Sequence, residues 1–375
     1  SELNEIEREI QEIDWEVSEA EKSGYDHFMY KEILEQSEVI ERTISGRLDT
    51  NSDDIPIMSD HASKFEKIWI VACGTAYHAG LFGKDLFEKV LGVPVSVELA
   101  SEFRYREPIV GKNDLGIVIS QSGETMDTIA ATELLKENGS HVLALVNVVG
   151  SSLARMADSV FYLHVGPEIG VASTKAYLGM LVSQLVLAKH WDSKNRLDVT
   201  FDEIAELPNL IDKTMACEDQ IKEISEKIYK KNDIYFIGRG LDYALAAEGA
   251  LKLKEISYLH AEALAAGELK HGTLALIEEG TPVVVTASQN HLLDKTTSNV
   301  QEVIARGAYV IAIGDSESEK LENISNDYVT LPDSNEILTT VISIIPLQFI
   351  AYHVANKNGQ SIDQPRNLAK SVTVE

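Results

Sequence analysis

Short apolar runs alternate along most of the chain with longer segments whose apolar residues recur at helical spacing. The run 115–119 is short and rich in β-branched residues, which is typical of a strand buried on both faces of a parallel sheet. In the segment that follows, 126–134, the apolar residues share one helical face, among them Met126 and Ile129. Strands that alternate with helices predict a parallel sheet covered on both sides.

The chain also matches itself. Residues 67–120 align with residues 233–286 at a constant offset of 166 without a gap, and after a two-residue slip 142–147 matches 310–315. Each half reads as strand, glycine turn, helix, short strand, helix, strand, helix, strand. The sequence therefore predicts an α/β protein of two tandem doubly wound parallel sheets, flavodoxin-like or Rossmann-like, followed by a tail.

The repeats also suggest where domains begin and end. We place a helical lead-in at 1–44, the first domain at 45–195, a linker carrying a helix at 196–219, the second domain at 220–355 and a tail at 356–375. The tail belongs to neither repeat.

Hydroxyl side chains gather between the buried strand and the following helix. Ser120, Ser122 and Thr125 lie within six residues, together with one glycine. The start of a helix presents free N–H groups and the positive end of its dipole, so an anion there would receive backbone and hydroxyl donors together. One such residue is enough to cap a helix, but three exceed what a cap requires. The segment therefore predicts a phosphate site.

The second repeat differs at this point. Its corresponding segment, 286–291, has lost the hydroxyl set, so we expect one such site per chain. It carries ionisable residues at 252–255 and 268–271 instead. Ligands of doubly wound sheets lie outside the carboxyl ends of the strands, so binding groups of one repeat and acid–base groups of the other could face one cleft.

Composition narrows the classes of function. A hydrophobic content of 44% and a charged content of 25% are typical of a globular protein, and the net charge of −27 argues against a nucleic-acid partner. The apolar stretch 341–355 is too short to span a bilayer, and residues 1–22 are acidic and do not read as a signal peptide. Two cysteines make no disulfide framework. We expect a cytoplasmic protein without a membrane partner.

The sequence gives weaker support for a dinucleotide or a metal ion as the ligand. Gly238-Arg-Gly240 follows a strand, but Tyr243 stands where a dinucleotide fingerprint has a third small residue. His260 and Glu262 lack a third metal ligand, and Cys73 lacks a nearby base, so we interpret it as packing. We therefore expect no metal and no cofactor.

Several ordered motifs together resemble the sugar isomerase (SIS) domains of the glucosamine-6-phosphate synthase family, the isomerising glutamine–fructose-6-phosphate aminotransferases. The resemblance runs from residue 24 to the end of the chain. Its motifs are 72–75, 101–105, 120–125, 168–175, 248–256, 267–271 and 364–375.

The resemblance implies a set of substrate contacts. Fructose 6-phosphate would be the substrate, with glucose 6-phosphate or glucosamine 6-phosphate as product. The phosphate would be held by Ser120, Gln121, Ser122 and Thr125, and the sugar would be lined by Thr75, Val171, Ser173 and Ala369.

The resemblance also implies the chemistry. Lys370 would form a Schiff base with the open-chain ketose, Glu255 would move a proton between C1 and C2 with help from Lys252, and His271 would open the ring, reaching the site from the second subunit of a homodimer. Taken singly, Glu255 would be interpreted as a solvated residue and Lys252 as its ion-pair partner. His271 would be interpreted as structural and Lys370 as an ordinary tail residue. Together they suit the reaction, because ring opening needs a group that titrates near neutrality, and an amine and a desolvated carboxylate can carry the remaining steps.

Two positions depart from the family pattern. Ala76 stands where many relatives have serine, and Thr273 replaces the usual proline. The family's N-terminal glutaminase domain, with its nucleophilic cysteine, has no counterpart here, so we expect isomerisation without glutamine hydrolysis. Two alternatives stay open: a sugar-phosphate sensor without catalysis, which needs the serine loop only, and an isomerase or deglycase for another phosphosugar.

Overall fold

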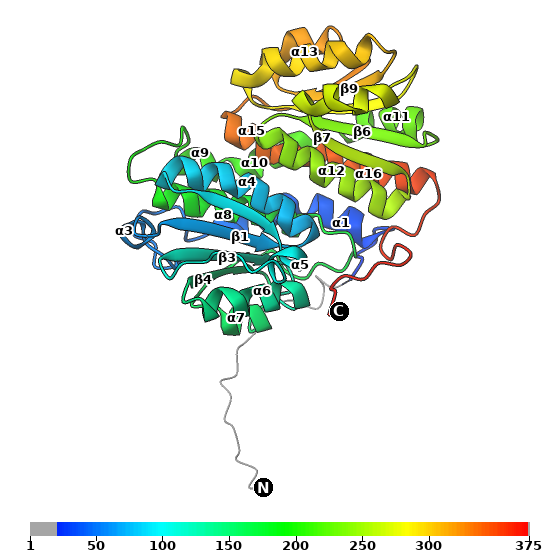
Figure 1. Cartoon of the computed structure of the whole chain (residues 1–375). Helices are drawn as coiled ribbons and strands as arrows, with labels where there is room; N and C mark the ends of the chain where they lie inside the picture. The colour runs from blue at the N-terminus through cyan, green and yellow to red at the C-terminus, as the bar shows by residue number, and fades with distance from the viewer. Residues whose placement is uncertain (1–20, 374–375) are drawn as a thin grey trace.

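Two α/β lobes stack on one another in the computed structural model, which describes residues 21–373 (Figure 1). The first sheet has the strand order β2-β1-β3-β4-β5, and the second has β10-β9-β8-β6-β7, which is the same order read in reverse. All neighbouring strands run parallel. The prediction of two tandem doubly wound parallel sheets is confirmed.

The order of elements within each lobe follows the prediction up to the fourth strand, and each lobe adds a fifth parallel strand, β5 or β10, that the sequence did not predict. The strands are β1 Lys67–Ala72, β2 Val95–Leu99, β3 Asp114–Ser120, β4 His141–Val146, β5 Ser159–Tyr162, β6 Asp233–Gly238, β7 His260–Ala265, β8 Pro282–Ala287, β9 Tyr309–Gly314 and β10 Asp327–Thr330. The longer helices are α1 Phe28–Leu34, α2 Gln36–Ile44, α4 Gly74–Leu91, α6 Met126–Glu137, α8 Lys175–Trp191, α10 Leu207–Met215, α11 Glu218–Ile228, α12 Leu241–Ser257, α13 Leu293–Ile304, α15 Glu336–Ile342 and α16 Ile344–Lys357.

A core shared by both lobes joins the two sheets. Side chains of β1 alternate between its two faces, so that Ile68 and Ile70 enter this shared core while Trp69 and Val71 enter a smaller cluster on the outer face. Helices α4, α8, α12 and α16 lie between the sheets (Figure 1). The two lobes are therefore held together by continuous apolar packing, which keeps groups on α4 and α12 at fixed distances.

The register of the second sheet corrects the alignment of the repeats. Trp69 pairs with Gly116, whereas Tyr235, which lies 166 positions later, pairs with Val283 rather than Pro282. The ungapped alignment up to residue 286 is therefore wrong, because one residue is inserted between β7 and β8. In the corrected register, Ala287 is the counterpart of Ser120, and the loss of hydroxyl groups begins at the strand end itself.

One helical stretch differs from its sequence interpretation. Residues 336–357 form 22 residues of helix with mean hydropathy 1.7, which is long and apolar enough to cross a membrane by length and composition. The expectation that this region is too short was therefore wrong. All of its most apolar window is buried inside the protein, as in a core helix of a globular protein.

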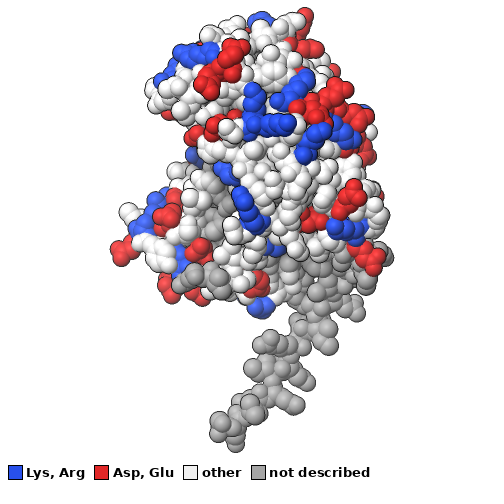
Figure 2. Space-filling model, turned by 90° about the vertical axis from the view of Figure 1, so that its right-hand side faces the viewer, with Lys and Arg blue, Asp and Glu red and all other residues white. Residues whose placement is uncertain are grey.

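On the face shown in Figure 2, acidic and basic side chains are intermixed around a largely uncharged centre.

The N-terminal lead-in and the C-terminal tail are tied to each other. Asp363 in the tail accepts hydrogen bonds from the N–H groups of Phe28 and Met29 at 3.0 Å each, where α1 begins. The tail then runs down the side of the molecule from the second lobe to the first (Figure 1). Of the predicted lead-in, residues 1–20 lie outside the described residues, and 28–44 form α1 and α2.

Candidate active site

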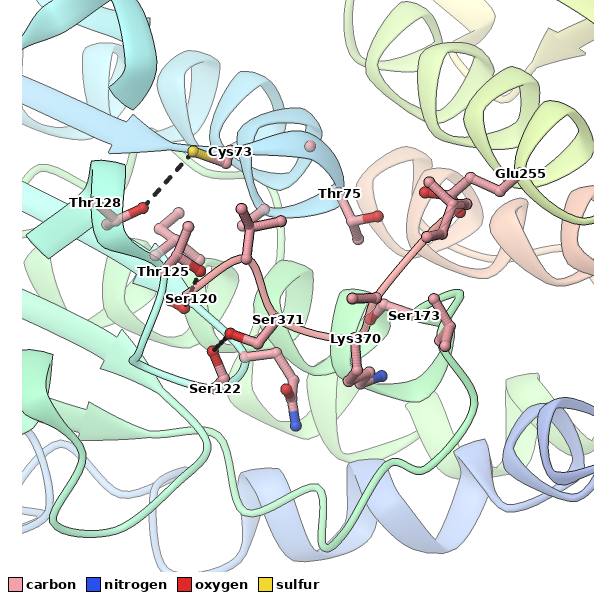
Figure 3. Close-up of a pocket in the computed structure, with 18 of the residues that line it drawn as sticks. Cys73, Thr75, Ser120, Ser122, Thr125, Thr128, Ser173, Glu255, Lys370 and Ser371 are labelled. Carbon is pink, nitrogen blue, oxygen red and sulfur yellow. Dashed lines mark hydrogen bonds between the residues drawn. The ribbon is translucent and has the colours of Figure 1, made fainter. Parts of the chain in front are cut away.

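A cavity of about 290 Å³ lies beyond the carboxyl ends of β1 and β3 (Figure 3). These strands flank the point where the strand order reverses, which is where doubly wound sheets bind ligands. Loops after both strands, helix α12 and the tail enclose it. The predicted site residues that line it are Thr75, Ser120, Gln121, Ser122, Thr125, Val171, Ser173, Lys252, Glu255, Ala369 and Lys370.

One end of the cavity is formed by the hydroxyl-rich loop. Ser120 ends β3, and its Oγ accepts the N–H of Gly123 at 3.0 Å. Thr125 occupies the N-cap position of α6 but makes no side-chain capping bond, so its hydroxyl group is not used as a cap. The Met126 N–H donates to the Val372 carbonyl at 3.2 Å. The loop thus offers the cavity donors that the helix does not need.

Glycine is required at position 123. Its φ is +67°, and a Cβ atom there would lie 2.1 Å from the Ser151 Oγ. A side chain would therefore be strained by the backbone and would clash with a neighbour. This explains why the loop can turn so tightly around the space that its hydroxyl groups surround.

Charged groups from α12 form the opposite end (Figure 3). The Lys252 Nζ lies 2.5 Å from the Glu255 Oε2 and 3.3 Å from the Glu248 Oε1. It also donates to the Thr75 Oγ1 at 3.0 Å, and the Thr75 hydroxyl in turn donates to Glu248 at 2.9 Å. Burial would lower the pKa of Lys252, but the Glu248 and Glu255 carboxylates outweigh it and raise that pKa well above its ordinary value. Lys252 is therefore a fixed cation beside Glu255.

The tail closes the cavity from one side. The Ser371 and Ser122 hydroxyl groups lie 3.1 Å apart, so the tail contacts the hydroxyl-rich loop directly. The Lys370 ammonium is turned onto the buried Glu168 carboxylate and the Gly170 carbonyl, the latter at 2.8 Å. The buried Ser173 Oγ has no hydrogen-bond partner in the described part of the chain. That hydroxyl remains available to a polar ligand.

His271 is not brought into the cavity. It ends the short 3-10 helix Ala266–His271, is exposed, and does not line the cavity of its own chain. Thr273, at the predicted proline position, begins the next 3-10 helix and is half-buried.

Sequence reasoning missed several residues of this site. Cys73 was read as packing alone, but it lines the cavity, with its Sγ 3.8 Å from the Thr128 Oγ1. Burial raises its pKa, so it stays a thiol. Glu248 carries no local signal, because its partners Thr75 and His78 lie on α4 in the other repeat. Within residues 21–373, no group of three or more His, Cys, Asp or Glu side chains could hold a metal ion.

The second lobe fills its own switch point with a side chain. Asp242 on α12 is 166 positions after Ala76. Its buried carboxylate accepts the Ser288 hydroxyl at 2.6 Å and the Ser288 N–H at 3.1 Å, just beyond the end of β8. Burial raises the pKa of Asp242 to about 6. An internal carboxylate thus occupies donors of the kind that the first lobe leaves open around Ala76.

A buried carboxyl group of α1 lies under the cavity wall. Glu32 accepts the N–H groups of Ile169 at 2.5 Å and Gly170 at 3.1 Å. Burial raises the pKa of Glu32 to about 7, and the nearby carboxylate of Glu168 adds to the rise.

This raised pKa predicts a pH-dependent stability. The folded state binds the Glu32 proton more tightly than the unfolded chain, where the pKa is near 4.5. The resulting stabilisation is complete below pH 4.5 and is lost as the pH rises through 7. Relative to Glu32→Gln, the wild-type free energy of unfolding should fall by about 2.5 kcal/mol between pH 5 and pH 8. Urea denaturation at both pH values measures this, and a difference independent of pH would contradict it.

Comparison with known proteins agrees with this fold. The SIS domain family matches residues 62–189 and 227–356, which contain both sheets. The chain therefore belongs to the SIS-domain family. Within that family, it corresponds in sequence to the sugar-isomerase part of the isomerising aminotransferases described next.

Individual relatives and solved structures are similar to this chain over nearly its whole length. The chain is 49% identical to the isomerising glutamine–fructose-6-phosphate aminotransferase of Clostridium tetani and 46% identical to that of Thermococcus kodakarensis, over 99% of its own length. It spans only 63% and 62% of those relatives. The C-terminal domain of glucosamine-fructose-6-phosphate aminotransferase from Francisella tularensis superposes with a TM-score of 0.84 at 41% identity, covering 92% of this chain and 100% of that one. A glucosamine-6-phosphate deaminase from Thermotoga maritima, 21% identical with a TM-score of 0.75, shares the fold.

Proposed function

We propose that this chain isomerises fructose 6-phosphate to glucose 6-phosphate, and that it forms glucosamine 6-phosphate when ammonia is supplied. The observation that carries the proposal is one cavity with two chemically different ends. Its hydroxyl-rich loop suits the phosphate on C6 of a hexose 6-phosphate, and C1 and C2 at the other end of the same sugar would meet Lys252, Glu255 and Lys370. A binding module would need only the first end.

The reaction follows from the groups at the second end. The Lys370 amine attacks C2 of the open-chain ketose and, with loss of water, forms a Schiff base that withdraws electrons from C1. Ammonia, when supplied, attacks the imine carbon and displaces the Lys370 amine, and Glu255 then removes a proton at C1 of the released imine and returns it at C2, which gives glucosamine 6-phosphate. Without ammonia, water hydrolyses the Schiff base, and Glu255 moves the same proton on the free open-chain ketose through an enediol, which gives glucose 6-phosphate. The Lys252 ammonium, held between two carboxylates, stabilises the negative charge that develops on the sugar. No metal or cofactor is needed for these steps.

The two domains divide the work in this proposal. The first, 45–195, holds the phosphate, the second, 220–355, supplies Glu255 and Lys252, and the tail, 356–375, supplies Lys370. Because His271 is exposed and outside the cavity, we assign ring opening to the His271 of a second copy in a homodimer. We further propose that a glutaminase region in the cytoplasmic full-length protein supplies ammonia.

A coupled assay tests the activity. Purified chain, given fructose 6-phosphate, should produce glucose 6-phosphate that a dehydrogenase converts with formation of NADPH. Binding of fructose 6-phosphate without any product would instead support a sugar-phosphate sensor.

Ser122→Ala should weaken substrate binding more than turnover. The hydroxyl group would donate to a phosphate oxygen, and a hydrogen bond to a charged group contributes about 1.5–3 kcal/mol, so KM should rise about tenfold to a hundredfold. The kcat value should stay within about threefold, because the loop is remote from the reacting carbons. Steady-state kinetics decide this, and a fall in kcat at constant KM would contradict the phosphate role.

A further inference from the structure

The resting position of Lys370 points to a second group that handles its proton. The Lys370 Nζ donates to the Glu168 Oε2 and to the Gly170 carbonyl rather than extending into the open cavity. Neither Glu168 nor Gly170 lines the cavity, whereas Lys370 does. The ammonium is therefore stored at the wall, next to the space where its nitrogen would react.

Glu168 is built into the protein as a fixed carboxylate. Its side chain is fully buried, and its Oε1 accepts the N–H groups of Thr174 at 2.8 Å and Ala176 at 3.1 Å, where α8 begins. Burial would raise the pKa of Glu168, but the Lys370 ammonium and these backbone donors hold it below its ordinary value. One oxygen is thus anchored on the helix and the other is directed at Lys370.

The surrounding charges leave Glu168 as the acceptor of choice. Glu32 faces the same segment, but because burial raises its pKa to about 7 it is only about half ionised at neutral pH. Lys175 is paired with Glu35 at 2.9 Å. A proton leaving Lys370 therefore meets the ionised Glu168 oxygen that it already contacts.

We propose that Glu168 accepts the proton that the Lys370 ammonium must lose before it attacks the substrate carbonyl, and returns it when water leaves; this rests on the Schiff-base role proposed above. The proton passes from Nζ to the Glu168 Oε2, and the neutral amine forms the N–C2 bond. A proton moves from nitrogen to the former carbonyl oxygen. Glu168 then protonates that hydroxyl group, the C–O bond breaks with release of water, and the product is an iminium ion paired with the Glu168 carboxylate.

Glu168→Gln separates this role from a structural one. A glutamine Oε1 can still accept the Thr174 and Ala176 N–H groups, but the side chain can neither take nor return the proton. Glu35→Gln is the matched control, because it removes a carboxylate from the same charged network that contacts Lys175 instead of Lys370. Glu168→Asp keeps the carboxylate but withdraws it by one methylene group.

The experiment measures how fast borohydride traps fructose 6-phosphate on the whole chain, together with the affinity for glucitol 6-phosphate, which has the phosphate but no carbonyl. Glu168→Gln should slow trapping, and kcat for ammonia-dependent glucosamine 6-phosphate formation, about a hundredfold, with glucitol 6-phosphate affinity within about threefold because the phosphate loop is untouched. Glu168→Asp should fall between this variant and the wild type, and Glu35→Gln should trap normally.

Trapping at the wild-type rate in Glu168→Gln would overturn the inference. If that variant does not fold, Glu168→Asp decides, and an unchanged trapping rate there overturns it equally. Absence of trapping in the wild-type chain would overturn the Schiff base itself, which is a different result from a slow Glu168 variant.

Discussion

Lys370→Ala is expected to lower kcat for glucosamine 6-phosphate formation from fructose 6-phosphate and ammonia about a thousandfold or more, because the variant loses the amine that activates C2 as a Schiff base. Affinity for glucitol 6-phosphate should change little, because the hydroxyl-rich loop and its helix start remain. Steady-state kinetics and ligand titration measure the two effects separately.

Lys254→Ala provides the matched control. Lys254 is exposed on α12 beside Glu255, and it does not line the cavity. The Lys254→Ala variant should keep kcat and the affinity for glucitol 6-phosphate near their wild-type values. A Lys370→Ala variant with more than a tenth of wild-type kcat would contradict the proposed role of the tail lysine.

Ala76→Asp should close the phosphate site by placing in the first lobe the carboxylate that Asp242 places in the second. A carboxylate about 5 Å from a phosphate costs about 3 kcal/mol at an effective dielectric constant of 20, which raises KM about a hundredfold. The residual turnover should keep its ordinary kcat at saturation. Fructose 6-phosphate titration and kinetics measure this.

Ala76→Asn separates charge from volume, because asparagine has the same shape without the charge. Ala76→Asn should raise KM by less than about tenfold, because it adds the same volume as Ala76→Asp without the charge that repels the phosphate. Equal losses in both variants would show that crowding, rather than an internal anion, distinguishes the two lobes.

Whether a site residue could be predicted depends on how far apart in the sequence its interaction partners lie. Ser120, Ser122 and Thr125 could be predicted, because a buried strand, a tight turn and a helix start are all encoded within a dozen residues. Glu168 and Glu248 could not be assigned roles, because their partners Lys370 and Thr75 lie 202 and 173 positions away.

The repeat alignment shows a further limit. Residues 117–120 match 283–286 in sequence at the offset of 166, although the structural offset there is 167, so only the strand pairing of Tyr235 with Val283 revealed the inserted residue. Similarly, the apolar stretch of α15 and α16 has the composition of a membrane helix, and its burial depends on the helices that pack against it, chiefly α11 and α12. Lys370 and Glu255 were predicted through the resemblance to a family, while their local sequence alone was unremarkable.

The central claim is that the tail lysine bonds covalently to a sugar whose phosphate is held by the hydroxyl-rich loop. Borohydride reduction of the chain mixed with fructose 6-phosphate, followed by peptide mass spectrometry, tests it most directly. We predict a single hexitol phosphate adduct on Lys370 that inorganic phosphate competes away. No adduct, or an adduct on another lysine, would contradict the account.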